Sequence, residues 1–123
     1  MPLGHKEEVV QVIPVDVSRM QVLVVGEPVA QFDEAGKAKL DRATGRPQWS
    51  VAVTLISDGR ADTVRLSLPE GGFPKELVIG MFIVPEGLQL IFWTKKDGTS
   101  GIMFTARSVK VAGGLPGLKS VAA

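Results

Sequence analysis

A strictly alternating run between residues 48 and 57 is the feature that most constrains the fold of this chain. Its odd-numbered positions carry the larger apolar side chains, which are Trp49, Val51, Val53 and Leu55. Its even-numbered positions carry small or polar ones, which are Gln48, Ser50, Ala52 and Thr54. A period of two in a run rich in β-branched residues predicts a half-buried β-strand. The preceding Thr-Gly-Arg-Pro segment, residues 44–47, predicts a turn.

Further strands are predicted before and after this run. Residues 20–29 form a nearly continuous Val/Leu segment that indicates burial on both faces, and Gly26 indicates a bulge or bend. Residues 63–68 place Val64, Leu66 and Leu68 inward, and they form an antiparallel hairpin with the first run across a turn at residues 57–60. The later strands are expected at 77–84, 88–95 and 102–111, with a turn or kink at 85–87 and an Asp97–Gly98 hairpin turn between the last two.

This order of strands predicts an all-β fold with little or no helix. A strand, a long basic loop, a hairpin, a short crossover and a second hairpin favour a five-stranded Greek-key barrel of the OB type. An SH3-like barrel and a small sandwich are the alternatives. The predicted organisation is an N-terminal arm over 1–19, the barrel over 20–111 and a flexible C-terminal tail over 112–123. In the arm, the apolar residues 9–13 indicate either an edge strand, a segment that docks on a second subunit, or a frayed terminus.

The composition argues against most catalytic and metal chemistries. The chain of 123 residues has no cysteine, which excludes disulfides and thiolate metal ligands, and its one histidine is His5. Glycine pairs lack the spacing of a phosphate-binding loop. We therefore expect no enzyme activity, no metal and no cofactor. The apolar stretch 77–93 is broken by glycine, proline and charge, and no secretory leader is recognisable, so a cytoplasmic protein without membrane contact is expected.

Basic side chains are the main candidates for ligand contacts. The net charge is only +1, so any affinity for a polyanion depends on local clustering. The candidates lie in the loop of residues 30–47, on the outward face of 63–68 and at the end of the second hairpin: Lys37, Lys39, Arg42, Arg46, Arg65, Lys95 and Lys96. Arg107 is a weaker candidate. The alternative interpretation of these residues is ordinary solubilising surface.

Three aromatic residues have two interpretations each. The alternation assigns Trp49 to the core, with the barrel rim beside the basic loop as the alternative. Trp93 directly precedes Thr94, Lys95 and Lys96, which favours either a stacking platform for a base or a subunit contact. Phe73 is expected to cap one end of the barrel, with stacking as the alternative.

Several short segments resemble bacterial single-stranded-DNA-binding OB domains, over residues 20–111. These segments are 22–26, 44–47 with 49–53, 80–84, 97–98 and 104–109. They are also similar to small proteins of plasmids and integrative elements that are described as regulatory or replication-associated. The resemblance implies a sequence-tolerant single-stranded-DNA-binding protein in DNA replication of a mobile element. One departure is the C-terminal segment 117–123, which is not acidic, so the partner-recruiting tail of the family is not implied.

A homodimer or higher oligomer is predicted from the excess of Val and Ile and from the apolar arm. The alternative function is a small β-barrel interaction or regulatory module that binds protein and not nucleic acid. The near-neutral net charge favours this alternative.

Overall fold

The computed structural model describes residues 9–41 and 43–114, and all of their regular structure is β. In chain order the strands are β1 (Val9–Pro14), β2 (Gln21–Val24), β3 (Val29–Ala30), β4 (Gln48–Ser57), β5 (Arg60–Pro69), β6 (Met81–Glu86), β7 (Gln89–Thr94), β8 (Ser100–Thr105) and β9 (Ser108–Gly114). No helix occurs in these ranges. The all-β prediction is therefore confirmed.

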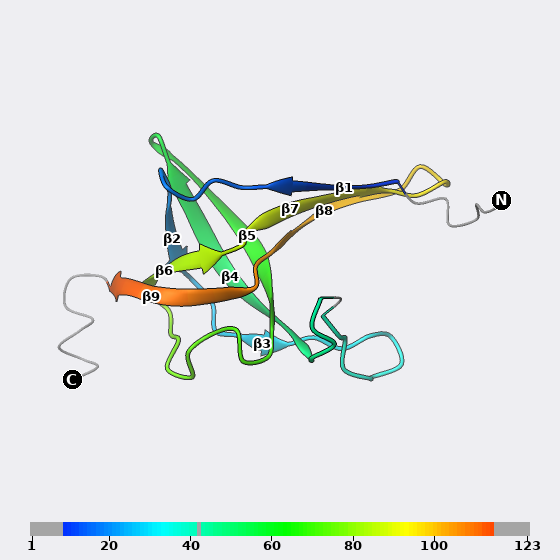
Figure 1. The fold of residues 1–123 in the computed structure, drawn as a ribbon, viewed down its shortest axis with the longest axis horizontal. Coiled ribbons are helices and arrows are strands. Elements are labelled where there is room, and N and C mark those ends of the chain that lie inside the picture. The colour runs from blue at the N-terminus through cyan, green and yellow to red at the C-terminus, as the bar shows by residue number, and fades with distance from the viewer. Residues whose placement is uncertain (1–8, 42, 115–123) are drawn as a thin grey trace.

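The strands form one curled sheet in the order β1-β7-β8-β5-β4-β2-β6-β9, with β3 paired to β4 outside this path. Only the β5–β8 pairing is parallel among the pairings of the described strands. The long β4–β5 hairpin crosses the molecule, and β1, β7 and β8 extend from it as a three-stranded ribbon (Figure 1). The curl is consistent with a β-barrel.

The described residues form nine strands, against five in the predicted barrel, because the runs 20–29, 77–95 and 102–111 are each divided in two and β1 is added. Near residue 25, the amides of Val25 and Gly26 both donate to the carbonyl of Ala52, at 2.9 and 3.2 Å, which is a bulge that separates β2 from β3. A Cβ on Gly26 would lie 2.9 Å from the Ala52 Cβ, which explains the glycine. Gly87, with a φ of +69°, separates β6 from β7, and residues 106–107 separate β8 from β9.

Two predicted boundaries were wrong. The strand expected at 77–84 begins only at Met81, because Leu77 and Gly80 bond to Pro74 and Val24 outside any ladder. It then continues through Pro85 and Glu86 and pairs there with β9, so of the turn or kink predicted at 85–87 only a bend at Gly87 is present.

Both ends of the described chain take part in the sheet. The predicted arm contains β1, an edge strand as one of the alternatives expected, in register with β7 from Val9↔Thr94 to Pro14↔Gln89. At the other end, β9 pairs with β6 as far as Gly114, inside the range predicted as a flexible tail. Residues 1–8 and 115–123 lie outside the described part of the chain.

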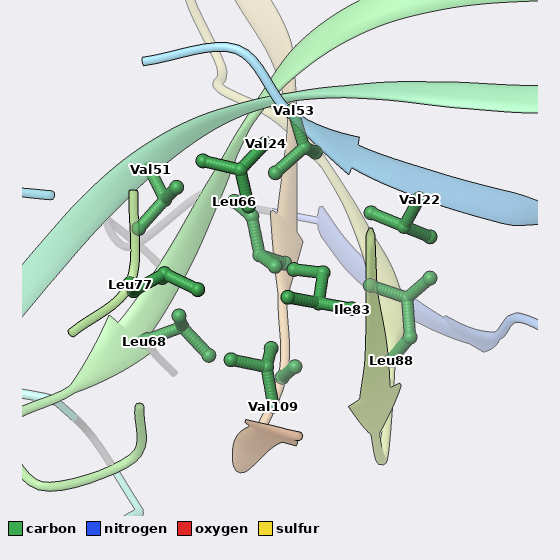
Figure 2. Close-up of a cluster of buried hydrophobic side chains, with 11 residues drawn as sticks. Val22, Val24, Val51, Val53, Leu66, Leu68, Leu77, Ile83, Leu88 and Val109 are labelled. Atoms are coloured by element: carbon green, nitrogen blue, oxygen red, sulfur yellow. The ribbon is translucent and has the colours of Figure 1, made fainter. Parts of the chain in front are cut away.

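The core lies on the concave side of the curled sheet. The odd-numbered residues of β4 and the even-numbered residues of β5 meet there, as the alternation predicted, and Val24, Val51, Val53 and Leu68 are completely buried. Figure 2 shows these side chains converging with Val22, Leu66, Leu77, Ile83, Leu88 and Val109. Burial of each such side chain contributes about 1.5–3 kcal/mol relative to exposure, so this cluster holds the strands of the curled sheet together.

Candidate nucleic-acid interface

Five neighbouring strands share one side opposite the core, which we call the outer face, and Ser50 and Ser67 on this side are buried. Directly paired residues lie on the same side of a sheet. Ser50 pairs with Ser67, Ser67 with Thr105, Thr105 with Gln89 and Gln89 with Pro14. The outer face therefore runs from β4 through β5, β8 and β7 to β1. The parallel neighbours Leu66 and Phe104 point to the opposite, core side.

Two hollows lie beside each other along this face. The first, of about 360 Å³, is bounded by Gln31, Arg65, Ser67 and Met103 together with Val64, Ile102 and Phe104. The second, of about 250 Å³, is bounded by Asp41, Thr44, Gln89, Thr105 and Arg107 together with Ala43, Pro69, Gly87 and Ala106. We call them the Arg65 hollow and the Arg107 hollow. Each takes one wall from the loop between β3 and β4 and another from β8, so the loop and the sheet together shape the surface.

The loop of residues 31–47 is built from two hydrogen-bonded turns. In the first, the Asp33 carboxylate accepts from the amides of Ala35 and Lys37, both at 2.9 Å, below the Phe32↔Ala38 bridge. In the second, Asp41 Oδ2 accepts from the amide and the hydroxyl of Thr44, at 2.9 and 3.0 Å. At these positions the aspartate carboxylate accepts hydrogen bonds from backbone amides of the same turn, which stabilises the turn. These turns give the long loop a defined structure, and it extends in the same direction as the ribbon (Figure 1).

The predicted cations of the loop point to different places. Lys37 and Lys39 are exposed in the first turn, and Lys39 lines a separate hollow of about 530 Å³ with Phe32, Asp33, Glu34 and Ala35. Arg46 Nη1 donates to the carbonyl of Glu70 at 3.4 Å, so its guanidinium lies over the turn after β5. Arg42 lies outside the described residues. The loop cations are therefore spread along the loop and do not gather at one point.

Arg65 lies at the centre of the outer face. Its guanidinium donates to Ser50 Oγ at 3.1 Å across the β4–β5 pair, and the side chain is exposed at the wall of the Arg65 hollow. The hydroxyl therefore orients the guanidinium along the sheet while leaving it accessible. Among the predicted cations in the described ranges, Arg65 is the one held on a strand of the curled sheet by a side-chain hydrogen bond.

Trp93 and Lys95 lie near the tip of the ribbon. Trp93 pairs with Gly101, and a Cβ on that glycine would lie only 2.2 Å from the indole, so the ring packs on the glycine backbone. The Lys95 ammonium lies over the ring, 5.5 Å from its centroid, in a cation–π contact. Lys96 is exposed next to it. The indole of Trp93 therefore packs on a glycine beside two lysines at this end of the ribbon.

The ribbon turn is stabilised by Asp97. The pKa of this exposed carboxyl lies below its ordinary value. The main cause is a hydrogen bond from the Thr99 side chain, and the second is a hydrogen bond from the Thr99 amide. The Lys95 amide donates to the Thr99 carbonyl at 2.7 Å, and Gly98 has a φ of +90°. The Asp-Gly signal thus corresponds to a closed turn that positions Lys95.

Trp49 lies away from the outer face. Its ring packs edge-on against Phe73, with centroids 5.7 Å apart, and Phe73 packs against the core. The indole Nε1 is buried and makes no hydrogen bond within the described residues. Trp49 therefore belongs to the core side near one end of the sheet, as the alternation predicted, and Phe73 covers that end.

Several polar residues of the two hollows were not predicted as site residues. Ser67 was assigned to the outward face by its alternation, but Gln31, Asp41, Thr44, Gln89 and Thr105 gave no signal. They meet because β8 returns beside β5 in a parallel pairing and because the loop between β3 and β4 adds a wall to each hollow, which short-range patterns do not report.

In residues 9–41 and 43–114, no three His, Asp or Glu side chains gather in a way that could hold a metal ion. Across the same ranges, a long apolar membrane-crossing helix is absent. Searches against family models, curated proteins and solved structures find no match to this chain.

Proposed function

We propose that the curled sheet is a five-stranded Greek-key barrel of the OB type in which three strands are interrupted. β2 and β3 then form the first strand, broken at the Gly26 bulge, because both pair with β4. β6 and β7 form the fourth strand, bent at Gly87, and β8 and β9 form the fifth, bent at 106–107. β1 is an additional strand on the edge of β7.

The pairing pattern supports this proposal. Counted in this way, the first strand pairs with the second and the fourth, and the third pairs with the second and the fifth. The fourth and fifth strands pair with each other along both halves. Each of the five strands then has two neighbours, which is the condition for a closed barrel. The crossover at 70–80 is the Greek-key connection.

We further propose that the protein binds single-stranded DNA, without strong sequence preference, along the outer face. OB folds bind oligonucleotides on the face of their second and third strands, between the first loop and the loop joining the last two strands. Here these parts are β4 and β5, the loop 31–47 and the tip of the β7–β8 ribbon. The observation that carries the proposal is that a basic loop and an aromatic, lysine-bearing ribbon extend on the same side of the β4–β5 hairpin (Figure 1).

The side chains on this face provide both kinds of contact that a single strand needs. Arg65, Lys95 and the loop cations can contact phosphates, and Trp93 can stack on a base. Stacking contributes about 1–3 kcal/mol per base, whereas an exposed cation–π contact such as that of Lys95 contributes about 0.5–1 kcal/mol. A base can therefore replace the ammonium over the indole with a net gain.

A fluorescence titration with labelled oligo-dT at two salt concentrations tests this function. We expect binding at low salt, a change in tryptophan emission, and a loss of affinity whose logarithmic slope is about 0.7 per phosphate contact. Replacement of Arg65 by methionine should flatten the slope, whereas Arg60→Met, at the far end of β5, is the matched control. Absence of binding at low salt, with unchanged tryptophan emission, would contradict the proposal.

The second candidate function, a protein-interaction module, is favoured by the apolar side chains of the ribbon. Val10, Val12 and Ile13 of β1 and Phe92 and Ile102 of the hairpin are all exposed. Exposed apolar patches of this kind are typical of protein interfaces. The same titration separates the two candidates, because a pure interaction module binds no oligonucleotide at either salt concentration.

A further inference from the structure

We propose that the Arg107 hollow receives one unstacked guanine of the bound strand. This inference rests on the proposed function and adds a preferred base at one position of an otherwise sequence-tolerant surface. The hollow lies where the second turn of the loop 31–47 approaches the bends that divide β6 from β7 and β8 from β9. It is next to the Arg65 hollow along β8, so a strand that follows the outer face passes its mouth.

The wall that carries Arg107 is formed by the two bends. The Arg107 amide donates to the carbonyl of Glu86 at 2.9 Å, which fixes the fifth-strand bend against the fourth-strand bend. The side chain then lies on Gly87, where a Cβ would be 2.7 Å from Arg107 Nε. The φ of +69° favours glycine, and a Cβ there would displace the Arg107 side chain. Gly87 therefore leaves the space that the guanidinium occupies at the edge of the hollow.

The opposite wall carries a carboxylate that is already held in place. Asp41 is half-buried, and its Oδ2 accepts two hydrogen bonds from Thr44. The Asp41 amide donates to the carbonyl of Arg46 at 2.7 Å, which fixes the backbone of the same turn. A carboxylate that is held in place therefore lines the same hollow as the exposed side chain of Arg107. Gln89, Thr44 and Thr105 add neutral polar groups, while Pro69, Ala43 and Ala106 provide apolar contact for a ring.

These groups select among the possible occupants. A phosphate is disfavoured because the Asp41 carboxylate would repel it, so the hollow suits a base and not the backbone. Guanine presents two neighbouring acceptors, O6 and N7, which match a guanidinium, and its N1–H and N2–H₂ donors match a carboxylate. Adenine, which pairs well with an amide side chain, is the main competitor through Gln89. Unpaired bases in single strands expose all of these edges for reading.

Binding of oligo-dT with a single central substitution tests the guanine pocket. We expect one dG to raise the affinity about tenfold over all-dT and over one dA, since one good bidentate contact discriminates by this order. An oligonucleotide with deoxyinosine, which lacks the 2-amino group, should lose the part of this affinity increase that depends on Asp41. An oligonucleotide with 7-deazaguanine, which lacks the N7 acceptor, should lose the part that depends on Arg107.

Two variants connect the preference to the named residues. Arg107→Met should abolish the dG preference and the sensitivity to 7-deaza substitution, and Asp41→Asn, which keeps an acceptor for Thr44, should abolish the sensitivity to inosine. Arg60→Met is the control that removes a guanidinium elsewhere, and circular dichroism confirms folding. Equal affinity for all-dT, dA and dG oligonucleotides overturns the guanine pocket alone, as does an unchanged preference in both variants. Absence of binding to any oligonucleotide at low salt overturns the proposed function with it.

Discussion

The curled part of the sheet and the β1–β7–β8 ribbon use similar strands but bury them differently. In β4 and β5 the inward side chains nearest the core are almost completely buried, as at Val53 and Leu68. In the ribbon both faces remain open, with Phe92 42% and Ile102 57% exposed on one side and Val10 43% and Val12 50% exposed on the other. An apolar strand pattern therefore indicates which residues share a face, but not whether anything covers that face. The difference separates residues that stabilise the fold from residues available to a partner.

The largest expected contrast is in stability. Leu68→Ala removes a fully buried side chain from the core and should lower the free energy of unfolding by about 2–5 kcal/mol. Ile102→Ala, a truncation of similar size in the ribbon, should cost well under half of that because its side chain is already exposed. Urea unfolding followed by circular dichroism measures both. Equal losses would mean that the ribbon contributes to the core as strongly as β5 does.

A second contrast concerns the glycine beneath the tryptophan. Gly101→Ala places a methyl group against the Trp93 indole and should shift the ring, reducing oligo-dT affinity by about five- to a hundredfold if the ring stacks on a base. Gly113→Ala meets nothing within 4 Å and is the matched control. Fluorescence titration and tryptophan emission report both effects. Full affinity in a folded Gly101→Ala protein would assign Trp93 to another role.

The open edge of β1 allows a third comparison. If a second copy covers the ribbon, Val12→Lys should lower the mass in solution to that of a monomer, because lysine on an edge strand opposes further pairing. Lysine at Val84, an exposed position on β6 within the curled part, should leave the mass unchanged. Light scattering coupled to size exclusion measures this. A wild-type protein that is already monomeric would exclude self-association through the ribbon.

The smallest expected effect is the pH dependence of the ribbon tip. The Thr99 hydrogen bonds lower the pKa of Asp97 in the folded state, so they stabilise the turn at neutral pH and lose this effect as the pH falls below the ordinary Asp range, roughly 4. Trp93 emission should therefore change in acid, and Asp97→Asn should remove that change. A transition that persists unaltered in Asp97→Asn would place its origin elsewhere, with Glu86 as the next group to test.

Local patterns predicted the parts of the fold that depend on neighbouring residues. The alternation in 48–57 and 63–68 identified the buried faces of β4 and β5, and the Asp-Gly signal identified the ribbon turn. The Gly26 bulge was also predicted from one residue in an apolar run. Each of these depends on backbone conformation or side-chain periodicity over a few residues.

The misplaced strand boundaries and the unpredicted hollows have a different physical origin. Pro85 continues a strand because a ladder tolerates a proline where its missing donor is not needed, and this depends on the β9 partner. Gln89 and Thr105 meet through a pairing that joins two strands, and Asp41 reaches the same hollow from the loop between β3 and β4. Such contacts leave no periodic trace, so the sequence indicated candidate cations and aromatic residues but not the polar walls of the hollow.

The short parallel contact between β5 and β8 has a consequence for how the chain reaches this structure. It is only two residue pairs long, Leu66↔Phe104 and Ser67↔Thr105, yet it joins the two hairpins. The β4–β5 hairpin closes over a tight turn and can form within microseconds, whereas this contact must wait until nearly forty residues have been arranged between its partners. Until then β5 presents an unpaired edge to other chains. A protein stalled at that stage is therefore the species in which aggregation should begin.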